Sequence, residues 1–243
     1  MRKGFLRFLF VLMVALASSG VALGNTADVD QSGDNNQASI EQIGEGNTAS
    51  CYQEGDSNGS GNFADVYQSG DDNEASIEQI GDDNTASCYQ ENGSGNTADV
   101  DQSGDNNQAY IGQDGSGNEA IQTQIGTGND VWAYQHGIGN SASQYQKGDY
   151  NLIAYIYIVG NFNNSICQRQ DGNNNEATIT IINGDYNTAD QWQEGNGNEA
   201  TITIINGDHN IVTQHQYGGN KSRIMIVGGS GVEVHLSGNQ NYP

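Results

Sequence analysis

The chain has 243 residues, with 30 acidic side chains against 7 basic ones and a formal net charge of −23. Binding to nucleic acid depends on Lys and Arg that displace counterions from phosphate, so this charge argues against nucleic acid as a partner. Low hydrophobicity and 34 glycines are typical of disorder. A single proline and a strict internal repeat indicate a folded chain instead, because repeats that bury little alone can stack into a continuous core.

The first 24 residues differ from the rest. Three basic residues precede the apolar run Phe8–Ala17, and Ala22 and Gly24 stand at positions −3 and −1 of a cleavage site. This pattern predicts a secretory signal peptide over 1–24, since the apolar run is shorter than the roughly 20 residues of a membrane span. Its removal leaves 4 basic residues against 30 acidic ones, a formal charge of 4 − 30 = −26.

An eleven-residue unit begins at Asn25 and repeats along the chain; its first copy reads NTADVDQSGDN. Positions 1, 3, 5 and 7 are Asn, Ala, an apolar residue or Cys, and Gln, whereas positions 2, 4 and 6 are mostly polar. Alternation with a period of two predicts a strand with one buried face, and Gly at position 9 supplies the positive φ of a tight turn. Eighteen units begin at Asn25, Asn36, Asn47, Asn62, Asn73, Asn84, Asn96, Asn107, Asn118, Asn129, Asn140, Asn151, Asn164, Asn175, Asn187, Asn198, Asn210 and Asn220.

The repeat predicts an all-β fold, a β-solenoid over 25–227 of about eighteen strand-turn units, followed by a tail, 228–243, that frays or caps. Two units make a coil of about 22 residues, so nine coils give a stack roughly 43 Å long. Residues 25–117 also repeat every three units, which leaves open a coil of three strands; residues 175–219 repeat after 23 residues, which favours two. The predicted core contains Ala38, Ile40, Ala75, Ile77, Ala109, Ile111, Ala177, Ile179 and Ile181.

Asn and Gln at inward positions need hydrogen-bond partners. Identical amides one coil apart can donate and accept along a ladder, which satisfies them. The predicted ladder contains Asn36, Gln42, Asn47, Gln53, Asn73, Gln79, Asn84, Gln90, Asn107, Gln113, Gln124, Gln135, Gln146 and Gln170.

Beyond residue 118 the units loosen and become more hydrophobic. Residues 151–163 (NLIAYIYIVGNFN) combine high β-propensity with an absence of charge, as aggregation-prone segments do. The acids of 25–117 oppose early association, so fibre nucleation is expected in 118–227. The candidate nucleating residues are Ile153, Tyr155, Tyr157, Ile179, Ile181, Ile202 and Ile204.

Three cysteines in a secreted chain leave at least one unpaired. Cys51, Cys88 and Cys167 are all expected in the core, as small buried hydrophobes rather than as a disulfide framework. Cys51 and Cys88 would stack, and could bridge, in a coil of three strands; with two strands they fall on opposite sheets.

The chemical motifs of the chain have structural explanations. The GxGxxA pattern, as at Gly44–Ala49, recurs because turn Gly, Asn and Ala belong to the repeat. Asp28, Asp30, Ser32 and Gly33 resemble the start of a calcium loop without its final Glu, which leaves weak calcium bridging between stacked acids as an open alternative. The four histidines lack metal-ligand spacing. We therefore expect no enzyme, no catalytic, metal or cofactor-binding residues and no cofactor.

The repeat resembles the curlin repeat, Ser/Asn-x5-Gln-x-Gly-x-Gly-Asn-x-Ala-x3-Gln. The chain carries this spacing from Gln42 through Gly44, Gly46, Asn47 and Ala49 to Gln53, and again at 113–124 and 135–146. The resemblance covers about 25–227. It implies a secreted subunit that folds as a β-solenoid and self-assembles into extracellular, pilus-like amyloid (curli) fibres on the cell surface, for adhesion and biofilm matrix. The implied partners are further copies of the chain, a minor curlin nucleator and an outer-membrane curli secretion pore.

Two other functions stay open. The outward Lys221 and Arg223 of the last unit favour a minor, nucleating curlin that docks on an acidic surface or template. Two rows of Thr-x-Thr, at Thr178/Thr180 and Thr201/Thr203, are also compatible with a monomeric solenoid that binds ice or carbohydrate. The export route stays open as well, because the repeats follow the predicted signal peptide directly.

Overall fold

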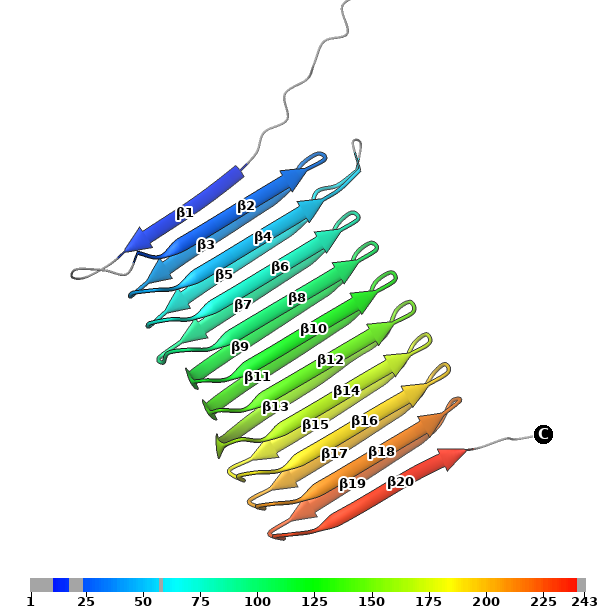
Figure 1. The fold of residues 1–243 in the computed structure, drawn as a ribbon. Helices are drawn as coiled ribbons and strands as arrows, with labels where there is room; N and C mark the ends of the chain where they lie inside the picture. Colours follow the sequence, from blue (N-terminus) through cyan, green and yellow to red (C-terminus); the bar gives the residue numbers. More distant parts are fainter. Residues whose placement is uncertain (1–10, 18–23, 57–58, 240–243) are drawn as a thin grey trace, which may run out of the picture.

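The structure, a computed structural model, describes residues 11–17, 24–56 and 59–239, and the regular structure in these ranges is entirely β (Figure 1). The strands are β1 (Val11–Ala17), β2 (Thr26–Ser32), β3 (Gln37–Ile43), β4 (Thr48–Glu54), β5 (Phe63–Ser69), β6 (Glu74–Ile80), β7 (Thr85–Glu91), β8 (Thr97–Ser103), β9 (Gln108–Ser116), β10 (Glu119–Ile125), β11 (Asp130–Ile138), β12 (Ser141–Lys147), β13 (Leu152–Phe162), β14 (Ser165–Asp171), β15 (Glu176–Ile182), β16 (Thr188–Glu194), β17 (Glu199–Ile205), β18 (Ile211–Tyr217), β19 (Lys221–Val227) and β20 (Glu233–Asn239).

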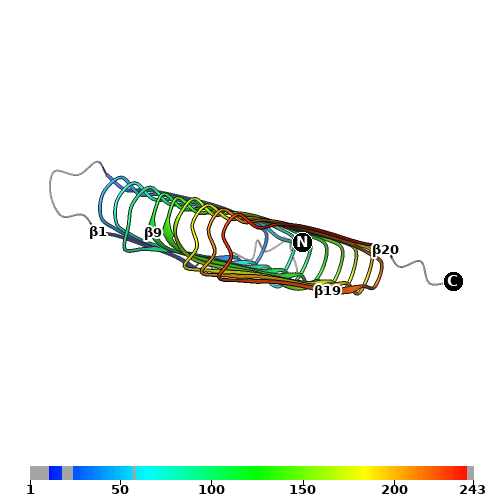
Figure 2. The same cartoon turned by 90° about the horizontal axis from the view of Figure 1, so that it is seen from below.

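These strands form two parallel sheets of ten strands each. One, the odd sheet, contains the odd-numbered strands in order, and the other, the even sheet, contains the even-numbered ones. Successive strands therefore alternate between sheets, and the two sheets lie face to face as a flattened coil (Figure 2). The predicted β-solenoid is confirmed, with two strands per coil. The three-strand alternative is wrong, because each strand pairs with the next but one, as β2 does with β4.

The register places equivalent positions of the repeat on top of one another. Ala38 pairs with Ala64 and Gln42 with Gln68, and the same correspondence holds along both sheets. The turns are as tightly constrained as the strands. Gly44 has φ 112°, and a Cβ there would lie 2.1 Å from the Gly70 carbonyl oxygen one coil away. Glycine is thus required both by its backbone conformation and by the close approach of stacked turns.

The thin core changes character along the stack. From β3 to β8, both sheets contribute Ala at position 3, Ile, Val or Cys at position 5 and Gln at position 7, all buried. From β13 on, the odd sheet places Ile at positions 5 and 7, whereas the even sheet keeps Gln at position 7 and places Gln at position 5 as far as β18. This second half is asymmetric, with an apolar sheet facing an amide-lined one.

An extra residue alters β13. The pairing of β13 with β15 shifts between Leu152 and Ala154, so Ala154, rather than Ile153, occupies position 3 opposite Ala177. The shift is a β-bulge, which moves every later side chain to the other face. As a result Ile156 and Ile158 enter the core.

Both ends of the chain contain strands outside the eighteen units. β20 lies in the predicted tail and pairs in parallel with β18. β1 lies within the predicted signal peptide, and its backbone runs beside β3 with Leu16 opposite Gln42. The signal peptide itself stays a prediction. In the described part of the chain, no helix is long and apolar enough to cross a membrane.

Candidate functional site

Glutamines at position 7 form ladders through the core. Gln42 Nε2 donates to Gln68 Oε1 at 2.8 Å, and its second hydrogen goes to the Thr26 carbonyl oxygen at 3.0 Å. The same amide–amide bond recurs one coil on along both ladders, so the buried side chains between the ladder ends have partners within the protein. The odd-sheet ladder is Gln42, Gln68, Gln90, Gln113 and Gln135. The even-sheet ladder is Gln31, Gln53, Gln79, Gln102, Gln124, Gln146, Gln170, Gln193 and Gln216.

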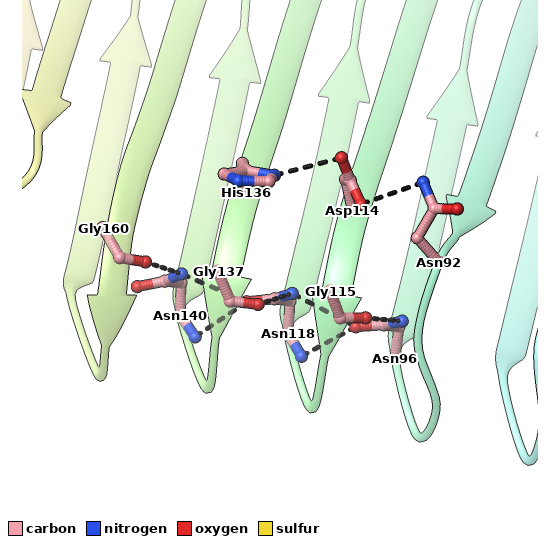
Figure 3. A network of polar contacts seen from close by, with 9 residues as sticks. All are labelled: Asn92, Asn96, Asp114, Gly115, Asn118, His136, Gly137, Asn140 and Gly160. Carbon is pink, nitrogen blue, oxygen red and sulfur yellow. Dashed lines mark hydrogen bonds and ion pairs between the residues drawn. The ribbon is translucent and has the colours of Figure 1, made fainter.

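Asparagines at position 1 tie each turn to its two neighbours. Figure 3 shows Asn118 Nδ2 donating to Asn96 Oδ1 at 3.2 Å in the preceding coil and to the Gly137 carbonyl oxygen at 3.0 Å in the following one. The backbone N–H of Asn118 also donates to Asn96 Oδ1, at 3.0 Å. The short side chain of Asn reaches backbone groups in the turn, which accounts for Asn at this position and Gln at the strand's far end.

A third ladder runs along the turns, and the sequence analysis missed it. Asp82 Oδ1 accepts the backbone N–H of Asp56 at 3.0 Å, and Asp105 Oδ1 in turn accepts that of Asp82 at 3.0 Å. Asn173 does the same for Asp149 at 2.8 Å. The signal was the Asp or Asn that directly follows the turn glycine, a residue type whose side chain bonds nearby backbone. These acids therefore hold turns together as well as charging the surface.

The predicted ladder residues are brought together in columns. All fourteen are at most 2% exposed, and their neighbours in each column are the equivalent residues of adjacent coils. Their action between molecules stays a prediction. A further amide column at position 5 of the even sheet was missed, because that position reads as apolar in the first units; it contains Gln122, Gln144, Gln168, Gln191 and Gln214.

The candidate nucleating residues do not form one patch. Ile179, Ile181, Ile202 and Ile204 are fully buried on adjacent strands β15 and β17. Tyr155 and Tyr157 lie half-buried on the outer face, as a consequence of the bulge in β13. For Ile153 the structure describes the backbone but not the side chain. The predicted nucleating role stays a prediction.

The outer face of the odd sheet carries a row of stacked rings. Tyr67, Tyr89, Tyr110, Trp132 and Tyr155 follow one another with centroids 6.3, 5.7, 5.4 and 4.5 Å apart. A hydrogen bond from the Tyr89 hydroxyl to Asp65, followed by burial, raises the pKa of Tyr89 to about 12. At position 6 of the odd-sheet strands, Gly112 stands in register between Tyr89 and Tyr134. Because Gly112 has no side chain, a pocket of about 130 Å³ is left there.

On the even sheet, the Arg169 guanidinium lies between two rings. It is 4.8 Å from the Tyr145 centroid and 5.3 Å from that of Trp192, on adjacent strands. Arg169, one of the few basic residues on this acidic surface, thus makes cation–π contacts with both rings.

The cysteines differ from prediction at one position. Cys51 and Cys88 are buried on opposite sheets, and burial raises the pKa of both thiols, that of Cys51 to about 12. Cys167 is exposed, so its predicted place in the core is wrong. It occupies position 4 of its unit, an outward position of the strand, while its neighbour Ile166 is buried. All three thiols are free.

Among the described residues, no group of three or more His, Cys, Asp or Glu is placed to hold a metal ion. His136 instead pairs with Asp114 at 3.0 Å, and His235 with Glu233 at 2.8 Å. Thr178 and Thr180 lie beside Thr201 and Thr203, so the two threonine rows do stack, as two rungs.

The fold and its side-chain ladders define a β-solenoid whose coils are joined by identical amides. A comparison with protein families matches the model described as the Curlin associated repeat at residues 24–55, 59–91 and 93–126. These matches confirm, for residues 24–126, the curlin repeat that the resemblance in the sequence predicted. The units beyond 126 continue the same two sheets in register. No curated protein matches the sequence.

Proposed function

We propose that this chain is a secreted structural subunit that stacks end to end through its strand edges into extracellular, curli-like amyloid fibres for adhesion and biofilm matrix. The observation that carries the proposal is the pair of parallel sheets, whose strands repeat once per coil and leave a backbone edge at each end of the repeats. A neighbouring molecule in the same register meets the same backbone edge that each coil meets inside the molecule.

The strand edges at the two ends of the repeats also support assembly. β3, the first strand of the repeats in the odd sheet, and β19, the last, have no further repeat strand beside them. Parallel edges of this kind template pairing with another chain unless they are covered.

A minor curlin that seeds the fibre and an outer-membrane secretion pore belong to the proposal as partners, on the strength of the family.

Fibre diffraction of the purified chain without residues 1–24 tests the function. We expect a reflection near 4.7–4.8 Å along the fibre axis together with thioflavin binding. A chain that stays monomeric for days at high concentration contradicts fibre assembly and favours the monomeric solenoid.

A nucleating curlin is the second candidate, because the two ends of the molecule differ in charge. β19 carries the exposed Lys221 and Arg223. Lys221 pairs with Glu199 at 2.5 Å, whereas no described residue pairs with Arg223. A seeding role predicts that substoichiometric amounts of this chain shorten the lag of another curlin, and an unchanged lag contradicts it.

A further inference from the structure

Orphaned amide atoms mark both ends of the position-5 glutamine ladder of the even sheet. The position-5 ladder begins at Gln122, which follows Val100 in the even sheet, and Gln122 Oε1 is buried without a partner. It ends at Gln214, which precedes Leu236, and Gln214 Nε2 is likewise buried and unpaired. Since each glutamine donates toward the C-terminal end, the position-5 ladder begins with a free acceptor and ends with a free donor.

The same signature occurs at the N-terminal edge of the repeats. Gln42 on β3 is fully buried, donates to Gln68, and has an Oε1 atom without any partner among the described residues. The residue in register on the other side is Leu16 of β1. β1 therefore occupies the place of a strand that would carry an amide at this position.

The C-terminal edge of this chain does not supply that amide. Directly before β20, Val232 stands at position 1, where its backbone N–H completes the last asparagine rung by donating to Asn210 Oδ1 at 2.9 Å. Gly238 of β20 stands at position 7, beyond Gln216. Both even-sheet ladders therefore end at β18, and β20 does not continue them. In β19, Ile226 occupies position 7, so the odd sheet offers no glutamine either.

The number of strands strengthens the mismatch. Without β1, ten strands remain in the even sheet and nine in the odd sheet. A second copy that continues both sheets without a gap must enter with its sheets exchanged, so that its β2 lies on β19 and its β3 on β20. Gln42 then faces Gly238 and Asn36 faces Val232. If the copy keeps its sheets, one strand position between β19 and the incoming β3 stays empty.

Resting on the proposed function, we propose that the N-terminal edge of this chain, β2 and β3, docks on the terminal strand of a different curlin-repeat chain, one that carries Asn at position 1 and Gln at position 7, and that β20 ends the ladders. A chain end of that chemistry donates its Gln Nε2 to Gln42 Oε1 and accepts the Asn36 N–H, as every internal rung does. A second copy of this chain offers neither group on β20.

The test supplies the missing groups. The chain without residues 1–24 is captured by its N-terminus, either as wild type or as the double variant Val232→Asn/Gly238→Gln, and the binding of wild-type chain in solution is measured. A side chain fits at Gly238, since a Cβ there would have no atom closer than Asn220 Nδ2 at 3.9 Å. We expect about tenfold tighter binding to the variant surface, the factor that one unmet buried hydrogen bond represents.

Two matched variants guard against a general effect of added side chains. Val232→Thr/Gly238→Leu fills the same space without the amides, and its surface should bind like wild type. Gln42→Leu in the soluble chain should lose the preference for the amide-bearing surface, provided that its circular dichroism shows the same β content. Equal binding to wild-type and Val232→Asn/Gly238→Gln surfaces overturns the inference alone. Absence of binding to every surface, together with absence of the 4.7–4.8 Å reflection, overturns the proposed assembly as well.

Discussion

At the scale of single residues, the chain is held together by buried amides whose side-chain partners are their equivalents in the adjacent coils. An amide transferred into an apolar core without a hydrogen bond is costly, whereas a fully paired network rigidifies the core. The hydrogen bonds of each ladder residue therefore depend on the coils on either side. Removing its amide leaves a hydrogen-bonding group unmet in each of those coils.

Replacing Gln79 by leucine tests this dependence. Gln79 accepts from Gln53 at 2.7 Å and donates to Gln102 at 2.8 Å and to the Phe63 carbonyl oxygen at 3.0 Å. Leucine keeps the volume but leaves Gln102 Oε1 without a partner, and Gln53 Nε2 keeps only its bond to the Gln37 carbonyl oxygen. Each buried hydrogen-bonding group left unmet costs about 1–3 kcal/mol. We expect Gln79→Leu to lower the free energy of unfolding by roughly 2–4 kcal/mol in denaturant titrations. The outward Glu78→Gln serves as control, and an equal effect of both variants contradicts the ladder's contribution.

Asp130 provides a pH-dependent case. Partial burial raises the pKa of its carboxyl group above the usual value. The folded state thus holds the proton more tightly than the unfolded one, so this residue destabilises the fold above the ordinary carboxyl pKa and ceases to do so below it. Asp130→Asn should therefore raise the melting temperature at pH 7 and leave it nearly unchanged at pH 3. A gain of the same size at both pH values rules out titration as its cause.

At the scale of strands, regular alternation made most of the fold predictable. Eighteen strands follow from the positions of Asn, Ala and Gln, and their two-strand coil follows where the repeat has 23 residues. The three-unit repeat of 25–117 was ambiguous, because sequence duplication and coil geometry have the same signature there. The bulge at Ile153 was not predictable from alternation, since one extra residue in a continuous apolar run leaves no mark. β20 was hidden because it lacks both amides of the repeat.

The asymmetric half of the stack bears on where assembly starts. From β13 to β19, the odd sheet has isoleucine at positions 5 and 7, and its two acidic side chains are balanced by two basic ones, so it combines the features of aggregation-prone strands. Deleting 151–227 should lengthen the lag of fibre formation, followed by thioflavin, far more than deleting 25–95. The reverse order would place nucleation in the acidic, regular half.

At the scale of the whole molecule, charge opposes the stacking that the ladders favour. Residues 25–117 hold 19 acids and no Lys, Arg or His. The register places Glu78 opposite Asp101 and Glu91 opposite Asp114, whereas most other acids on the strands face neutral residues. Like charges facing each other on adjacent strands are destabilising, although the turn ladder absorbs part of that cost through hydrogen bonds to backbone N–H groups.

Acid should therefore speed assembly. Between pH 8 and pH 4 an increasing fraction of the carboxyl groups takes up protons, which lowers the negative charge that two molecules must bring together. The raised pKa values of Asp101 and Asp130 place these two groups early in that titration. We expect a shorter lag of thioflavin fluorescence at pH 4 than at pH 8 for the chain without residues 1–24. High salt at pH 8 should shorten the lag in the same direction, because screening substitutes for protonation. Equal lag times at the two pH values would show that charge does not gate assembly.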